Sequence, residues 1–205
     1  MNTMEDRKPP LVLASASQSR ADMLRAAGLS FDTAPADIDE GAIKAAMSAD
    51  DAEAEDIAMA LARDKAGEIS RRRPEAAVIG ADQILRCEGE LFDKATDVPA
   101  ARRILQHLRG RRHELICAAC VCRNGALAWR YLSVARLTMR DFSDAYLDWY
   151  LGQVGEAVLW SVGGYQIEGL GAQLFDQVDG DHFTILGLPL LPLLGRLREL
   201  GVIED

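Results

Sequence analysis

The first hundred residues alternate short apolar runs with segments of helical periodicity, and this alternation restricts the fold more than any other feature of the chain. The apolar runs predict strands and the periodic segments predict helices: strands at 11–14, 30–33 and 76–81, and helices at 20–27 and 51–71. Two longer strand-like runs, 113–122 and 127–139, flank an Asn124-Gly125 pair, which is typical of a hairpin turn. The pattern predicts an α/β fold: a mixed, twisted sheet flanked by helices.

Three further helices and one more strand complete the prediction. Pro99 suits the first turn of a helix at 97–108, and Ser143 suits the N-cap of a helix that runs to about residue 152. Pro189 opens the last helix, and a strand is expected to lead up to Phe175. We treat residues 1–205 as a single domain, built as two lobes around a central cleft.

Composition and charge exclude several functional classes. The chain is 49% hydrophobic, which is ample for a core, and lacks the roughly 18 uninterrupted apolar residues of a membrane span. A formal net charge of −9 argues against nucleic acid as a partner, because phosphate contacts need an excess of basic residues. The basic runs at 71–73 and 109–112 suit the carbonyl ends of helices. The start, MNTMEDRKPP, has no apolar secretory stretch, so we expect a cytoplasmic protein without a membrane partner.

Three of the four cysteines, Cys117, Cys120 and Cys122, lie in one strand-like run. A zinc site normally has its ligands on turns, with a second pair elsewhere in the chain. We therefore favour buried, reduced thiols over a metal cluster.

The junction between the first strand and the first helix is rich in hydroxyl groups. Ser15, Ser17 and Ser19 precede Arg20 in the segment LASASQSRADML. Unpaired amide groups at a helix N-terminus attract anions, and the serines and Arg20 add donors and a positive charge. Ordinary capping of the helix is the alternative, although it needs only one serine.

The predicted helix at 51–71 carries a lysine on its apolar face. Lys65 falls in the series Ile57, Leu61, Lys65 and Ile69, in which each residue is four positions from the next. A lysine on a face directed at the core must reach either solvent or an anion. Both outcomes remain open at this point.

Two carboxylates could supply a metal site. Asp82 ends the apolar run VIGAD, and Glu40 ends the acidic segment ADIDE. Carboxylates from separate segments can bind a divalent ion that in turn binds phosphate oxygens, whereas a single strand-end aspartate is more often a turn residue. Lys94, in a turn-like segment, could balance a phosphate or lie exposed in solvent.

These motifs occur in a specific order. LASASQSRADML, DIDE, VIGADQ, FDK, the Gly-Tyr…Glu-Gly stretch and GLPL follow one another as in the Maf family of nucleoside triphosphate pyrophosphatases, which the chain resembles from Leu11 to about Leu200. The resemblance implies a Maf/ITPase-like two-lobed fold. It also implies cleavage of a nucleoside triphosphate between the α and β phosphates, with Mg²⁺ or Mn²⁺ as the cofactor.

The resemblance also implies roles for individual residues. By position, Asp82 matches the family's catalytic aspartate and Glu40 its acidic metal-site residue, so Glu40 and Asp82 would hold the metal. Lys65, Lys94 and Arg20 match the family's cations, and Ser15, Ser17 and Ser19 lie in the loop that binds the triphosphate. Two departures stand out: Gln18 and Ser19 replace a proline and an arginine of that loop, and Trp160-Ser161-Val162-Gly163 replaces a common Asp-Lys-Ala-Gly.

Two positions favour the branch of the family that acts on 7-methyl-GTP. Gln83 follows the aspartate, and Glu168 lies in the later glycine-rich stretch, where members acting on dTTP and UTP tend to have threonine and glutamine. One carboxylate can accept hydrogen bonds from both N1–H and the exocyclic amine of guanine. Methylation at N7 makes the base cationic, which favours Glu168 and a stacked Tyr165 or Trp160.

The resulting hypothesis is a metal-dependent pyrophosphatase that removes modified nucleotides from the pool. A dTTP/UTP or broad-range pyrophosphatase is the alternative within the same class, and a weakly catalytic, nucleotide-binding regulator of cell division is the alternative outside it. The expected partner is the nucleoside triphosphate substrate, and a homodimer is left open.

Overall fold

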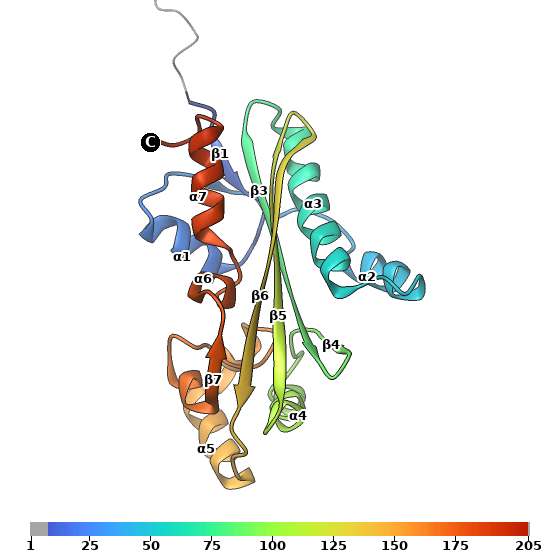
Figure 1. Cartoon of the computed structure of the whole chain (residues 1–205), viewed down its shortest axis with the longest axis vertical. Coiled ribbons are helices and arrows are strands. Elements are labelled where there is room, and N and C mark those ends of the chain that lie inside the picture. Colours follow the sequence, from blue (N-terminus) through green and yellow to red (C-terminus); the bar gives the residue numbers. More distant parts are fainter. Residues whose placement is uncertain (1–7, 205) are drawn as a thin grey trace, which may run out of the picture. The chain divides into compact units, whose positions relative to one another are not determined.

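A computed structural model describes residues 8–204 of the chain (Figure 1). Over these residues, seven strands form one open mixed sheet in the order β2-β1-β3-β5-β6-β7, with β4 paired to β3. Strand β1 runs parallel to β2 and β3, whereas β3–β4 and β6–β7 are antiparallel. The predicted mixed α/β sheet is thus confirmed. The strands are β1 Leu11–Leu13, β2 Asp32–Thr33, β3 Ala77–Cys87, β4 Glu90–Phe92, β5 Arg112–Arg123, β6 Ala126–Met139 and β7 Phe175–Asp179.

The chain divides into two compact units. The first contains the described residues up to Asp82, Cys117–Ser133 and the residues from Gly187 onward. The second contains Gln83–Ile116 and Val134–Leu186, so β3, β5 and β6 each contribute residues to both units. A cleft shared by two lobes stays a prediction.

The first unit has α3 on one side of β1 and β3, and α1 and α7 on the other (Figure 1). The apolar series on α3 is buried as its spacing predicts, since Ile57, Leu61 and Ile69 are almost fully inaccessible to solvent. The α-helices of this unit are α1 Gln18–Ala26, α2 Glu40–Ala49, α3 Ala54–Arg72 and α7 Leu190–Glu199.

Gly80 lets α3 pack directly against β3. A Cβ atom at this position would lie 2.1 Å from the carbonyl oxygen of Ala62 and 2.8 Å from the Cβ of Ala66, both on α3. Side chains alternate between the faces of a strand, so Asp82, two residues further along, projects toward the same side. The close approach at Gly80 therefore sets the distance between α3 and the carboxylate of Asp82.

Strand β3 continues past the end that the sequence predicts. Its first part pairs with β1, in the register Leu13 with Ile79, and its last part pairs with β4, in the register Leu85 with Phe92. Asp82 therefore lies within the strand rather than at its end. The polar Asp82-Gln83 pair suggests a strand end, but the partner strand changes on either side of it while β3 itself continues.

The structure also contains a helix that was not predicted, and it places the last strand differently. Helix α2 begins at Glu40, the last residue of the acidic segment, and the side chain of Asp39 accepts from the amide of Ala42. The last strand begins at Phe175 instead of ending there, because Leu170–Leu174 forms a 3₁₀-helix.

The second unit surrounds a core of aromatic and aliphatic side chains. Tyr165 and His113 are buried, and the ring of Phe175 packs edge-on against that of Tyr165. His182 is the first residue of α6. The helices of this unit are α4 Val98–Leu108, α5 Asp144–Val154 and α6 His182–Ile185, with 3₁₀ segments η1 Gly155–Leu159 and η2 Leu170–Leu174.

The structure tests what the sequence predicts about the cysteines and about membrane-spanning segments. All four cysteines are buried free thiols, which confirms the burial predicted for Cys117, Cys120 and Cys122. Within residues 8–204, no helix combines the length and the apolar character needed to cross a bilayer.

We predict that Gly80→Ala destabilises the protein. The added methyl group would overlap the backbone of α3, and overpacking of this kind typically costs about 1–3 kcal/mol of unfolding free energy. Chemical denaturation measures the effect. Gly195→Ala is the matched control, because a Cβ at Gly195 meets no atom within 4 Å and alanine favours the helix. Equal stability of the two variants would contradict the packing argument.

His113 should make stability depend on pH. Burial lowers the pKa of His113 from its ordinary 6.5 to about 4. Below pH 6.5 the unfolded chain binds a proton at this residue that the folded chain does not, so stability falls as the pH drops from 6.5 toward 4. Between pH 7.5 and 5 the loss should be roughly 2 kcal/mol.

His113→Gln should remove this part of the pH dependence, as measured by urea denaturation at both pH values. His182→Gln, at an exposed histidine, should leave the dependence intact. An unchanged slope in His113→Gln would assign the pH dependence to other groups.

Candidate functional site

Lys65 brings together two of the predicted acidic residues. Its Nζ lies 2.7 Å from Oδ1 of Asp82 and 3.0 Å from Oε1 of Glu40. The Lys65 and Asp82 side chains are 11% and 9% exposed, whereas that of Glu40 is 45% exposed. Lys65 thus reaches anions instead of solvent, which decides between the two alternatives that its position on the apolar face left open.

Three elements hold this cluster in place. Lys65 projects from the buried face of α3, and Asp82 from the interior of β3, on the side where Gly80 admits the helix. Glu40 is the first residue of α2, which Asp39 caps. Lys65 on α3 and Asp82 on β3 therefore lie close to Glu40 at the N-terminus of α2.

Arg20 is a second buried cation, and it is bound by neutral groups. Its Nε donates to the carbonyl oxygen of Gly187 at 2.7 Å, and its Nη1 donates to the carbonyl oxygen of Ala81 at 2.8 Å and to Oγ of Ser15 at 3.1 Å. Within the described residues, Arg20 forms no ion pair, and its Nη2 makes no hydrogen bond. A buried guanidinium without a carboxylate partner provides a positive potential suited to an anion.

The end of β1 explains where Arg20 binds. The amide of Ala14 donates to the carbonyl oxygen of Ile79, which completes the ladder between β1 and β3. The carbonyl of Ala81, two residues further along β3, points to the same side, beyond the end of β1. Arg20 donates to this carbonyl in place of a strand amide, so it lies beside the residue that precedes Asp82.

The predicted serines have different roles. Ser17 caps α1 by accepting from the amide of Arg20, as the capping alternative expects. Ser15 is buried, and its Oγ accepts from Arg20 and from the amide of Ser17. Ser19 lies within α1. The junction therefore orders Arg20 through Ser15 and starts the helix through Ser17.

Gln83 is held in one orientation in the second unit. Its Nε2 donates to the carbonyl oxygens of Thr184 at 2.9 Å and of Ile185 at 3.2 Å. Carbonyl oxygens only accept hydrogen bonds, so the amide nitrogen must face them, and Oε1 is directed away as an acceptor.

The other predicted residues of the second unit lie on its surface. Lys94 is exposed just after β4, and Glu168 is exposed just before η2. The backbone around Glu168 turns tightly, since a Cβ at Gly171 would lie 2.5 Å from the carbonyl oxygen of Gln166. Glu168 is thus carried on a compact turn.

The structure corrects the proposed stacking of Tyr165 on a base. Tyr165 is 5% exposed, and its hydroxyl group pairs with Nε2 of His113 at 2.8 Å inside the second unit. Trp160, by contrast, is 67% exposed. Ser161, which stands where the family commonly has a lysine, closes the local turn through both the amide and the carbonyl of Tyr165.

The cluster of Glu40, Lys65 and Asp82 also tests the fit of the expected metal. Both carboxylates contact one small cation, the Lys65 ammonium, so both can reach a common point. No group of three or more histidine, cysteine, aspartate or glutamate side chains suited to a metal occurs in residues 8–204. Mg²⁺ is commonly held by one or two carboxylates together with water and substrate phosphates. The donor set therefore fits an ion that a bound nucleotide helps to hold.

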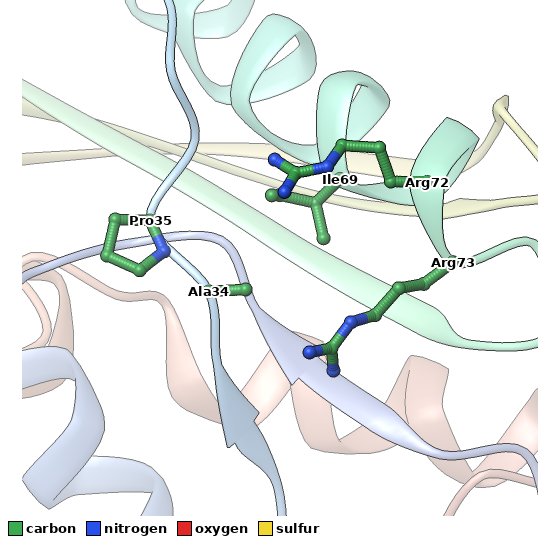
Figure 2. Close-up of a pocket in the computed structure, with 5 residues that line it drawn as sticks. All are labelled: Ala34, Pro35, Ile69, Arg72 and Arg73. Carbon is green, nitrogen blue, oxygen red and sulfur yellow. The ribbon is translucent and has the colours of Figure 1, made fainter.

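A separate cavity of about 300 Å³ opens in the first unit (Figure 2). Arg72 and Arg73, at the end of α3, line it together with Ala34, Pro35 and Ile69. Both guanidinium groups already have carboxylate partners, since Arg73 pairs with Asp32 and Arg72 with Glu68. The cavity includes none of the predicted site residues.

Sequence reasoning missed two residues that support the candidate site. Gly80 lies in the VIGADQ motif and Gly187 in GLPL, but the sequence assigns neither a role. The glycine two positions before Asp82 could have indicated close packing against a helix. Nothing in the sequence indicates that the carbonyl of Gly187 binds Arg20, because any residue carries that group.

Comparisons with known proteins agree on one family. A family model described as Maf-like protein matches residues 10–200. The chain is 50% identical over 188 residues to a protein of Brucella abortus named 7-methyl-GTP pyrophosphatase, covering 92% of this chain and 94% of that protein. It is 46% identical over 197 residues to a protein of the same name from Rhizobium meliloti, covering 96% and 99%. A protein of Granulibacter bethesdensis named nucleoside triphosphate pyrophosphatase is 50% identical over 189 residues, covering 92% and 96%. The chain therefore belongs to the Maf-like protein family.

Proposed function

We propose that the protein hydrolyses the bond between the α and β phosphates of a nucleoside triphosphate, with 7-methyl-GTP as its preferred substrate. The observation that carries the proposal is the contact of the Lys65 ammonium with both Asp82 and Glu40, three charged residues far apart in the sequence. The names of relatives that are about half identical over nearly the whole chain support the same reaction.

In this reaction, residues of the first unit act as one proton acceptor and two cations. Asp82 accepts a proton from a water molecule that attacks the α-phosphorus, while the bond to the bridging oxygen breaks and pyrophosphate leaves. The Nη2 group of Arg20 and the ammonium of Lys65 donate to phosphate oxygens, where negative charge develops. We assign Lys94 to the pyrophosphate leaving group.

Glu40 and Asp82 are the residues that would hold Mg²⁺ or Mn²⁺. When bound, the ion would neutralise negative charge on the phosphates. Both carboxylates contact Lys65, so they would hold the ion on the side of β3 on which Lys65 lies.

Gln83 and Glu168 recognise the base in this proposal. The amide nitrogen of Gln83 is occupied by two backbone carbonyls, so its oxygen is left to accept from an N–H group of the base. The carboxylate of Glu168 suits the paired donors of guanine, and the positive charge of the methylated base adds attraction. A base with acceptors in those positions would leave the carboxylate without a partner.

The first test measures pyrophosphate release from a panel of triphosphates, with and without Mn²⁺. We expect 7-methyl-GTP to have the highest kcat/KM, and UTP and dTTP to be poorer substrates. Asp82→Asn should lower kcat by about 10²–10⁴-fold, the usual contribution of a general base. Asp176→Asn, at an exposed aspartate of β7, is the matched control and should retain the wild-type rate.

Each outcome of that panel is informative. A folded Asp82→Asn variant with undiminished turnover would remove Asp82 from the role of base. Equal kcat/KM values across the panel would instead favour a broad-range pyrophosphatase.

Glu168→Gln should change base preference. Replacing the carboxylate with an amide removes one acceptor and the negative charge, so kcat/KM for 7-methyl-GTP should fall by about 10-fold or more relative to UTP. Steady-state kinetics with both nucleotides measure the ratio, and Glu156→Gln, an exposed glutamate of η1, is the control. A ratio that stays constant would exclude Glu168 from base recognition.

A further inference from the structure

We propose that Lys65 competes with the divalent cation for the carboxylates of Asp82 and Glu40, so that the cation is bound together with the nucleotide and only weakly without it. The inference rests on the proposed function and concerns the control of that same site. Its basis is the position of Nζ, 2.7 Å from Oδ1 of Asp82 and 3.0 Å from Oε1 of Glu40.

The ammonium uses the oxygen atoms that a metal ion would need. Hard divalent cations bind carboxylate oxygens at about 2.0–2.6 Å, on the same lone pairs that accept from an ammonium group. A cation bound to both oxygens would lie within a few ångströms of Nζ if Lys65 kept its present contacts. Because Lys65 and Asp82 are both about nine-tenths buried, solvent would screen this repulsion poorly. Entry of the cation therefore requires Lys65 to leave at least one carboxylate.

The charges of the cluster make this exchange unfavourable without a further anion. Glu40 and Asp82 supply two negative charges, Lys65 supplies one positive charge, and Arg20 adds another beside the carbonyl of Ala81. These four residues are electrically balanced, so they attract a divalent ion weakly. A triphosphate supplies the missing negative charge, and its oxygens can accept the ammonium that the carboxylates release.

The side chains differ in how easily they can rearrange. Asp82 is fixed within β3 and is almost fully buried, whereas Glu40 is half-exposed at the start of α2. Lys65 has a flexible four-carbon stem, so its ammonium can move while its backbone stays in α3. We therefore infer that Lys65 changes partners, from the two carboxylates to phosphate.

The test is direct measurement of Mn²⁺ binding to the nucleotide-free protein by calorimetry or electron paramagnetic resonance. Lys65→Met removes the ammonium and retains most of the apolar stem, and it should bind Mn²⁺ on the order of tenfold more tightly than wild type, within the usual range for coupled sites. Lys8→Met, which makes the same change in net charge at a residue paired with Glu204, should bind as wild type does. Equal or weaker binding by a folded Lys65→Met variant would overturn the proposal.

Two further measurements keep the proposal testable if Lys65→Met does not fold. Lys65→Gln retains a neutral donor for the carboxylates and should also tighten Mn²⁺ binding, whereas wild-type affinity in this variant would overturn the inference. In the wild-type protein, a non-hydrolysable α,β-methylene triphosphate should tighten Mn²⁺ binding. The Mn²⁺ that the analogue binds in buffer without protein is measured separately and subtracted. Equal affinity with and without the analogue would also overturn it.

Turnover distinguishes this inference from the proposed function. A wild-type protein that releases pyrophosphate while Lys65→Met binds Mn²⁺ no more tightly refutes the competition alone. A protein that hydrolyses no triphosphate while Lys65→Met binds Mn²⁺ more tightly refutes the proposed function alone.

Discussion

The ammonium of Lys65 is the charge on which the candidate site depends. It lies on the apolar face of α3, where an unpaired charge would be costly, and two carboxylates compensate it. The same contacts join an acid fixed in β3 to one at the start of α2. Removing Lys65 would leave two carboxylates close together without a cation between them. Removing either acid would leave the buried Lys65 ammonium with only one carboxylate partner.

Arg20 provides a second positive charge by a different route. It extends the hydrogen bonding of the sheet beyond the end of β1 through the carbonyl of Ala81, and it also binds the carbonyl of Gly187. Because these partners carry no net charge, Arg20 keeps its positive potential, whereas that of Lys65 is largely offset. The two cations thus differ in what they offer an anion: Arg20 is already ordered and uncompensated, and Lys65 must first be released.

Local patterns in the sequence predicted the features that depend on spacing. The four-residue series on α3 placed Lys65 on the apolar face of the helix, and the Asn124-Gly125 pair predicted the hairpin between β5 and β6. Features that depend on distant partners were not predictable in this way. The continuation of β3 past Asp82 follows from pairing with β1 and then β4, and the burial of Tyr165 follows from contacts with His113 and Phe175. The start of α2 at Glu40 was not predicted, because Asp39 was treated as part of an acidic segment and not as an N-cap.

The placement of Asp82 inside a strand limits what this carboxylate can do. An aspartate on a loop can follow an approaching ligand, but the backbone of β3 is tied to neighbouring strands before and after residue 82. The acid is therefore fixed in position. Under the proposed function, any adjustment to different phosphate geometries would fall to the Lys65 stem and to the half-exposed Glu40. Lys65 and Glu40 would then allow different nucleotides to bind, whereas the fixed Asp82 would determine which phosphate bond is cleaved.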